Sequence, residues 1–130
     1  MMPVMHILSL KPLSCTLIMA CVAMMILPAC SNTIPKEALR RKGDQAAMIN
    51  DWPTAAEWYA QVADRDPTSW RAQYALGHAS LEAGDLSTAR RALEIASALK
   101  PQSNAVARDL ADTMEQQEAW DDLFAYLRDR

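Results

Sequence analysis

Cysteine, histidine and glycine are scarce in this sequence, and each scarcity removes a class of chemistry. The three cysteines, Cys15, Cys21 and Cys30, all lie near the N-terminus, so the chain beyond them has no disulfide and no cysteine-based metal or redox site. His78 is the only histidine after His6, and the three glycines form no phosphate-binding loop. No His-Glu metal motif or nucleophile elbow occurs either. We therefore expect no enzyme, no cofactor and no metal.

The chain also lacks a strong charge of either sign. It has 13 Lys and Arg against 16 Asp and Glu, a formal net charge of −3. This mildly acidic balance gives no support to a nucleic-acid partner, and no motif indicates a small-molecule substrate. The apolar run from Leu13 to Leu27 is shorter than the roughly 20 residues that a membrane-spanning helix needs.

That apolar run fits a secretory signal instead, with Lys11 in front of it and a small residue at its end. It closes on residues 27–31, Leu-Pro-Ala-Cys-Ser, which resemble the lipobox of bacterial lipoproteins. The resemblance implies that residues 1–29 are a removed signal peptide and that Cys30 carries a diacylglyceryl anchor. Two alternatives stay open: an uncleaved signal anchor, and a second site at Cys21 whose apolar lead is shorter.

An internal repeat organises the rest of the chain. One fixed shift of the sequence against itself aligns Ala38 with Ala72, Gly43 with Gly77, Asp51 with Asp85, Thr54 with Thr88, Ala55 with Ala89, Pro67 with Pro101 and Ser69 with Ser103. This period of about 34 residues, with small residues at fixed offsets, resembles the tetratricopeptide repeat family. The resemblance implies an all-α array of about three helical hairpins, six helices in a right-handed superhelix.

The repeat defines the domain organisation that we expect. Residues 30–35 are the lipidated cysteine and a short tether, and residues 36–130 are the repeat domain. Its repeats are 36–69, 70–103 and a truncated 104–130. Terminal repeats usually deviate because they cap the stack with a polar outer face. The residues expected on that face are Asp121, Asp122, Arg128, Asp129 and Arg130.

Individual positions have clear physical roles in such hairpins. Gly43 and Gly77 allow the two helices to approach closely. Asn50 and Gly84 fit a turn that needs a left-handed residue, whereas the third repeat lacks this glycine–aspartate turn. Asp51 and the equivalent aspartate of the second repeat are expected to cap the helices that follow. The large residues expected in the inter-helix core are Trp52, Tyr59, Leu86, Leu93 and Trp120.

In the family that the chain resembles, the first helices line a concave groove that binds partners. The groove residues implied by this resemblance are Arg40, Asp44, Met48, Arg71, Tyr74, His78, Leu81, Arg108 and Asp112. Tyr74 and Leu81 suit an apolar or aromatic side chain of a partner, and the arginines suit acids. The simpler interpretation is that Arg40–Asp44 and Arg108–Asp112 are pairs within one helix. Tyr74 and His78 then only stack on each other.

The combination predicts a membrane-anchored scaffold for protein–protein interaction. It resembles pilotins and Tad/Flp-type pilus lipoproteins, which implies a role in assembling a pilus or a secretin-type secretion complex. Ser31 after the lipidated cysteine resembles outer-membrane sorting, which implies a place on the periplasmic face of the outer membrane. The alternative function is an adaptor for cell-wall hydrolases. An enzyme that uses groove carboxylates is a remote third.

Overall fold

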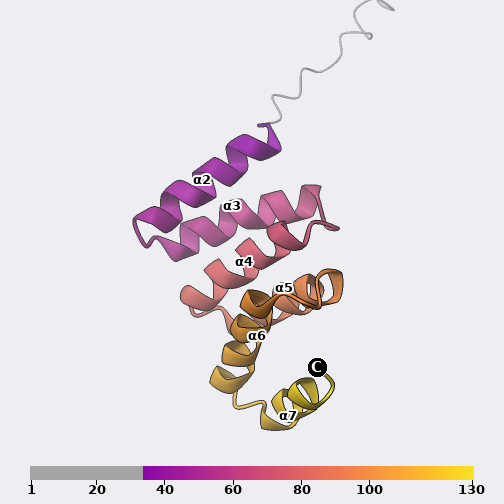
Figure 1. The fold of residues 1–130 in the computed structure, drawn as a ribbon. Helices are drawn as coiled ribbons and strands as arrows, with labels where there is room; N and C mark the ends of the chain where they lie inside the picture. The colour runs from indigo at the N-terminus through magenta and orange to yellow at the C-terminus, as the bar shows by residue number, and fades with distance from the viewer. Residues whose placement is uncertain (1–33) are drawn as a thin grey trace, which may run out of the picture. The chain divides into compact units, whose positions relative to one another are not determined.

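Six α-helices follow one another along residues 34–130, the part of the chain that the computed structural model describes. The first helices of the three hairpins are α2 (Lys36–Met48), α4 (Trp70–Glu82) and α6 (Asn104–Gln116). The second helices are α3 (Trp52–Arg65), α5 (Leu86–Leu99) and α7 (Trp120–Arg128). Figure 1 shows successive hairpins stacked in chain order, with the C-terminus beside α7. The predicted all-α array of helical hairpins is confirmed.

The predicted signal peptide, residues 1–29, and the predicted lipidation site, Cys30, lie outside the described residues. Between residues 34 and 130, no helix combines the length and the apolar character needed to cross a membrane. Attachment of the chain to a membrane therefore stays a prediction from the sequence.

Two glycines determine how closely the two helices approach each other within the first and the second hairpin. A β-carbon built on Gly43 would lie 2.6 Å from Cε1 of Tyr59, and one built on Gly77 would lie 2.6 Å from Cγ of Leu93. Real β-carbons are not found at such distances from their neighbours, so α2 packs on α3, and α4 on α5, only because both side chains are missing. The close approach expected of Gly43 and Gly77 is confirmed.

The turns within the hairpins all use one left-handed residue. Asn50 has φ 59° and Gly84 has φ 80°, as predicted for these two positions. Glu118 takes the same place in the third hairpin with φ 57°. The third turn therefore keeps the geometry of the other two although its sequence lacks the glycine or asparagine that normally accommodates it. The third repeat therefore differs from the other two at this turn in residue type and not in backbone conformation.

Side-chain caps start four of the six helices. Asp51 and Asp85 accept hydrogen bonds from the backbone N–H three residues on, at 3.3 and 3.1 Å, as expected of N-caps. Ser69 and Ser103 do the same for α4 and α6 at 3.4 and 3.5 Å. Ala119, which precedes α7, has no side chain able to do so. The last helix consequently starts with an uncapped turn.

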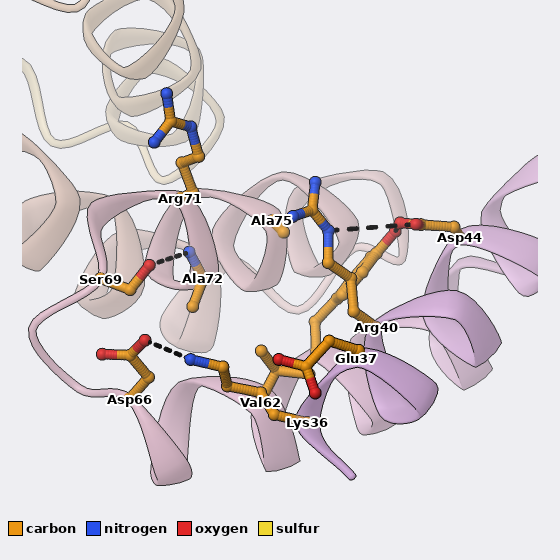
Figure 2. A pocket seen from close by; sticks show the side chains of 11 residues that line it. Lys36, Glu37, Arg40, Asp44, Val62, Asp66, Ser69, Arg71, Ala72 and Ala75 are labelled. Carbon is orange, nitrogen blue, oxygen red and sulfur yellow. Dashed lines mark hydrogen bonds and ion pairs between the residues drawn. The ribbon is translucent and has the colours of Figure 1, made fainter.

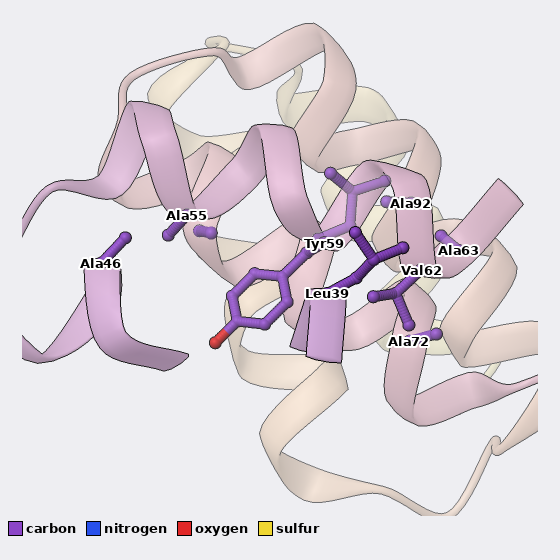
Figure 3. Packing of buried hydrophobic residues seen from close by; sticks show 10 residues of the cluster. Leu39, Ala46, Ala55, Tyr59, Val62, Ala63, Ala72 and Ala92 are labelled. Atoms are coloured by element: carbon purple, nitrogen blue, oxygen red, sulfur yellow. The ribbon is translucent and has the colours of Figure 1, made fainter. Parts of the chain in front are cut away.

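The buried side chains form two neighbouring clusters. The first lies between α2, α3 and α4 around Leu39, Tyr59 and Val62, and Ala92 of α5 also belongs to it (Figure 3). The second lies between α4, α5, α6 and α7 and contains Leu81, Ala89, Leu93, Ala96, Val106, Leu110, Met114 and Leu123. Because each cluster takes residues from successive hairpins, the repeats are held together by a continuous core, as stacked repeats require.

The third hairpin is more open than the others. Ala111 occupies the position equivalent to Gly77, and Leu123 that equivalent to Ala89. The two larger side chains keep α7 from approaching α6 as closely, and α7 packs only sparsely on it. As a result Leu127 is 55% exposed, whereas its counterpart in α5 is fully buried.

Two expectations for α7 need correction. The repeat pattern predicts Trp120 in the core, but this side chain is 47% exposed. The equivalent Trp52 is covered by the next first helix, α4, and among the described residues no helix follows α7 in this way. The expected polar outer face is also incomplete, since Phe124 is 66% exposed among the predicted charges.

Candidate partner-binding groove

A cleft of about 190 Å³ lies between α2, α3 and α4 (Figure 2). Its floor is apolar and small, because Val62, Ala72 and Ala75 contribute only short side chains. Its rim carries charges of both signs: Lys36, Glu37, Arg40, Asp44, Asp66 and Arg71. The cleft thus brings together three of the predicted groove residues, Arg40, Asp44 and Arg71.

Several of these charges are already paired. Lys36 Nζ lies 2.7 Å from Asp66 Oδ2, which ties the start of α2 to the end of α3. The hydroxyl of Tyr59 donates a hydrogen bond to Asp44 at 2.7 Å. Asp44 also has Arg40 Nε at 4.0 Å, so the predicted pair within α2 is present but loose. These contacts organise the walls of the cleft.

The pKa values of three side chains that line the cleft are shifted by these contacts and by burial. The hydrogen bond with Asp66 raises the pKa of Lys36, and the same contact lowers the pKa of Asp66. Burial, reinforced by the hydrogen bond to Asp44, raises the pKa of Tyr59. At neutral pH the Tyr59 phenol is therefore neutral, and Lys36 and Asp66 carry opposite charges that offset each other.

Arg71 remains available at the edge of the cleft. It is exposed at the start of α4, and its guanidinium lies 4.8 Å from the ring of Trp70. Figure 2 shows its side chain extending away from the Lys36–Asp66 pair. Among the described residues, no carboxylate lies within ion-pair distance of Arg71. In the same part of the chain, no Lys, Arg or His side chain lies within ion-pair distance of Glu37. These two charges are the ones that a ligand in the cleft can engage.

A second polar cluster joins the second and third repeats. His78 Nδ1 lies 2.9 Å from Asp109 Oδ2, linking α4 to α6. Tyr74 stacks on His78 with ring centroids 5.9 Å apart, and Trp52 meets His78 edge-on at 5.8 Å. Burial, together with the Asp109 carboxylate, raises the pKa of Tyr74. The stacking of Tyr74 on His78 expected from the simpler interpretation is observed.

Other predicted groove residues are placed differently. Arg108 Nε lies 3.5 Å from Asp109 Oδ1, and no Arg108–Asp112 pair is formed within the described part of the chain. The pairing of these two residues expected from their spacing is therefore not observed. Leu81 is only 9% exposed and belongs to the second core cluster, so it offers little surface to a partner. Met48 is 83% exposed at the end of α2 and is not among the residues that line the cleft.

Asp109 is the important residue that the sequence did not reveal. It is 3% exposed, unlike nearly all the other carboxylates of the chain, and it holds both His78 and Arg108. Its only sequence signal is its position next to the buried Leu110 in α6. That signal is weak, because it becomes meaningful only when the packing of α4 against α6 is known.

Comparisons with known proteins agree with this architecture. Residues 50–112 match the tetratricopeptide repeat family. MamA of AMB-1 superposes with a TM-score of 0.67 at 20% identity, covering 72% of this chain and 51% of its own. MamA of MSR-1 gives 0.65 at 20% identity, with 72% and 54% covered. A MamA mutant gives 0.66 at 21% identity, with 77% and 71% covered. No curated protein matches the sequence.

The matches define the class of fold. Residues 34–130 form a tetratricopeptide-type array of helical hairpins, and this chain spans about half the length of the first two MamA structures. This fold is typical of scaffolds that bind other proteins. Within residues 34–130, no three His, Cys, Asp or Glu side chains are grouped so that they could hold a metal ion.

Proposed function

We propose that this chain is a scaffold that binds a protein partner in the groove lined by its first helices. The observation that carries the proposal is the cleft between α2, α3 and α4. It combines a small apolar floor with two uncommitted charges, Arg71 and Glu37, on its rim. Such a combination suits an extended peptide segment with a small apolar side chain flanked by an acid and a base.

The aromatic cluster extends this surface toward the third repeat. Tyr74 and His78 are only partly buried on α4, and Arg108 is exposed on α6. A segment that leaves the cleft along α4 meets first the aromatic pair and then this arginine. Aromatic and arginine side chains are those that most often dominate protein interfaces. The partner therefore contacts more than one repeat.

The second element of the proposal is a lipid anchor at Cys30. It rests on the apolar run and the lipobox-like residues 27–31. Residues 31–35 between Cys30 and α2 span at most about 18 Å when extended, so an anchored chain holds its first hairpin near the bilayer. Each buried methylene contributes about 0.8 kcal/mol, and two or three acyl chains hold a protein stably.

We further propose that the anchored scaffold acts at the periplasmic face of the outer membrane, in assembly of a pilus or secretin-type complex. The proposal rests on Ser31 after the proposed lipidated cysteine and on the resemblance, drawn from the sequence alone, to small repeat lipoproteins of such systems. The cell-wall hydrolase adaptor is the competing function. Both need a groove that binds protein, so the groove can be tested independently of the pathway.

The test of function is co-purification after mild crosslinking in native cells. The wild-type chain is compared with the double variant Tyr74→Ala/Arg108→Glu, both checked for equal helix content. We expect a secretin or pilus component with the wild type and its loss with the variant. A wall hydrolase in that place supports the adaptor function instead, and identical partners for both proteins contradict binding through the groove.

The anchor is tested separately by metabolic labelling with a fatty acid. Cys30→Ser should abolish the label and leave the larger precursor, whereas Cys21→Ser, as the matched control, should change neither. Labelling that persists in Cys30→Ser and is lost in Cys21→Ser would move the anchor to the other site.

A further inference from the structure

The last helix carries an apolar face that nothing within residues 34–130 covers. Trp120, Phe124 and Leu127 are 47%, 66% and 55% exposed, and their spacing places them on one side of α7. Leu123 and Tyr126 lie on the side that packs on the second core cluster. The exposed face is therefore separate from the face that attaches α7 to α6.

The charges around this face have a definite order. Asp121 is in the first turn of α7 and Arg128 in the last. Their spacing of one heptad places both on the same flank of the apolar stripe, about two turns apart. Asp121 has no ion-pair partner among the described residues, and Arg128 has only its exposed neighbour Asp129 at 3.4 Å. The flank is thus acidic at one end and basic at the other.

This arrangement is complementary to itself when reversed. If two α7 helices pack antiparallel about a two-fold axis near Phe124, Trp120 of one copy faces Leu127 of the other. In an antiparallel pair the same flanks meet, so Asp121 of each copy lies beside Arg128 of the second copy. Both apolar faces become covered, and both charges gain an opposite partner, as an isologous interface requires.

We propose that a second copy of this chain docks on α7, through an antiparallel α7–α7 contact. The proposal does not depend on the groove, because the face of α7 is distinct from the cleft between α2, α3 and α4. Three side chains from each copy form a contact that is smaller than the roughly 1,200–2,000 Å² of a stable specific interface. Association is therefore weak, and crosslinking in the cell detects it better than dilute chromatography.

The first test places a photo-crosslinking phenylalanine analogue at residue 124 of the full chain. Two copies with different epitope tags are co-expressed and irradiated. The matched control carries the same analogue at Glu94, which is exposed on α5. We expect a crosslinked product of twice the chain mass that contains both tags from position 124, at least about tenfold above the control. No such product, or a product with another protein in its place, overturns the proposal.

A charge-reversal series tests the antiparallel register. Asp121→Arg alone and Arg128→Asp alone each place like charges together and should lower the crosslinked product about threefold to tenfold. The double variant Asp121→Arg/Arg128→Asp restores both pairs in a symmetric dimer and should recover the wild-type yield. These positions are exposed, but Asp121 lies in the first turn of α7 and Arg128 in the last, so each reversal opposes the helix dipole and costs about 0.3–1 kcal/mol. The helix content of every variant is therefore measured by circular dichroism beside the crosslinking. Failure of the double variant to recover overturns the antiparallel contact.

Discussion

Gly77 and Leu93 are packed so closely that the second hairpin has no room for a β-carbon on α4. The built β-carbon would lie 2.6 Å from Leu93 Cγ and 3.2 Å from the backbone nitrogen of Leu93. Both atoms are held firmly, because Leu93 is fully buried and its nitrogen belongs to α5. The hairpin closes at this point only with glycine, although glycine weakens a helix by about 1 kcal/mol relative to alanine.

The sign of the effect of Gly77→Ala tests this packing. Helix propensity alone predicts that alanine stabilises the protein by about 1 kcal/mol. We expect the reverse, a loss of about 1–3 kcal/mol, because α4 and α5 must move apart. Urea unfolding followed by circular dichroism measures the change, and Gly77→Leu should unfold the array. A stabilised Gly77→Ala would show that the two helices are not in close contact there.

The third turn predicts a gain in stability. Glu118 adopts a left-handed backbone conformation with φ 57°, which costs a residue with a β-carbon about 1 kcal/mol. Glu118→Gly should therefore raise the free energy of unfolding by about 0.5–1 kcal/mol. The matched control is Gly84→Ala. Open space surrounds this position but its φ is 80°, so alanine there should lower the free energy of unfolding by a similar amount. Equal stabilities for all three proteins would contradict the strain.

The missing cap of α7 predicts a second gain. Ala119 precedes α7 without a side-chain hydrogen bond, where Asp51 and Asp85 cap the equivalent helices. Ala119→Asp should stabilise the third hairpin by about 1 kcal/mol, and Asp85→Ala should destabilise the second by about the same amount. Hydrogen exchange of the first amides of α7 locates the gain. Unchanged exchange in Ala119→Asp would mean that the start of α7 does not limit its stability.

The cap at Asp85 also predicts a dependence on pH. Hydrogen bonds from Thr88, then from Ser87, lower the pKa of Asp85 in the folded protein. A lowered pKa gives stability that is complete above the unfolded value of about 3.9 and is lost as the pH falls through the folded value. The difference in unfolding free energy between wild type and Asp85→Ala should therefore be constant from pH 7 to 5 and shrink below about pH 4. A difference that persists at pH 2 would contradict the role of the carboxylate.

Much of the fold could be predicted from the sequence because its constraints are local and repeated. Gly77 and Asp85 have identical counterparts one repeat earlier, and Gly84 has a counterpart of another residue type. Each residue is needed for one local reason: close helix packing, helix capping or a left-handed turn. Trp120 could not be placed in this way, because its exposure depends on what packs over α7 rather than on its own helix. The repeat pattern therefore predicted where Trp120 lies on its helix, but not which residues would pack over its side chain.

The candidate site was predictable only in part. Position in the repeat identified Arg40, Asp44 and Arg71, which do share a cleft. It did not identify Asp66, because that residue follows a second helix, whereas the repeat pattern predicts a groove only from first helices. Nor did it identify Asp109, whose contact with His78 joins two different repeats. Both contacts depend on the packing between successive elements, which spacing within one helix does not show.

The most direct test of the groove is the affinity of the captured partner for two arginine variants of the full chain. Arg71→Glu reverses the uncommitted charge at the cleft, and Arg91→Glu makes the same change at an exposed position on α5. We predict at least a tenfold loss of affinity for Arg71→Glu, about 1.4 kcal/mol, and wild-type affinity for Arg91→Glu. Equal affinities for the two variants would contradict partner binding through the groove.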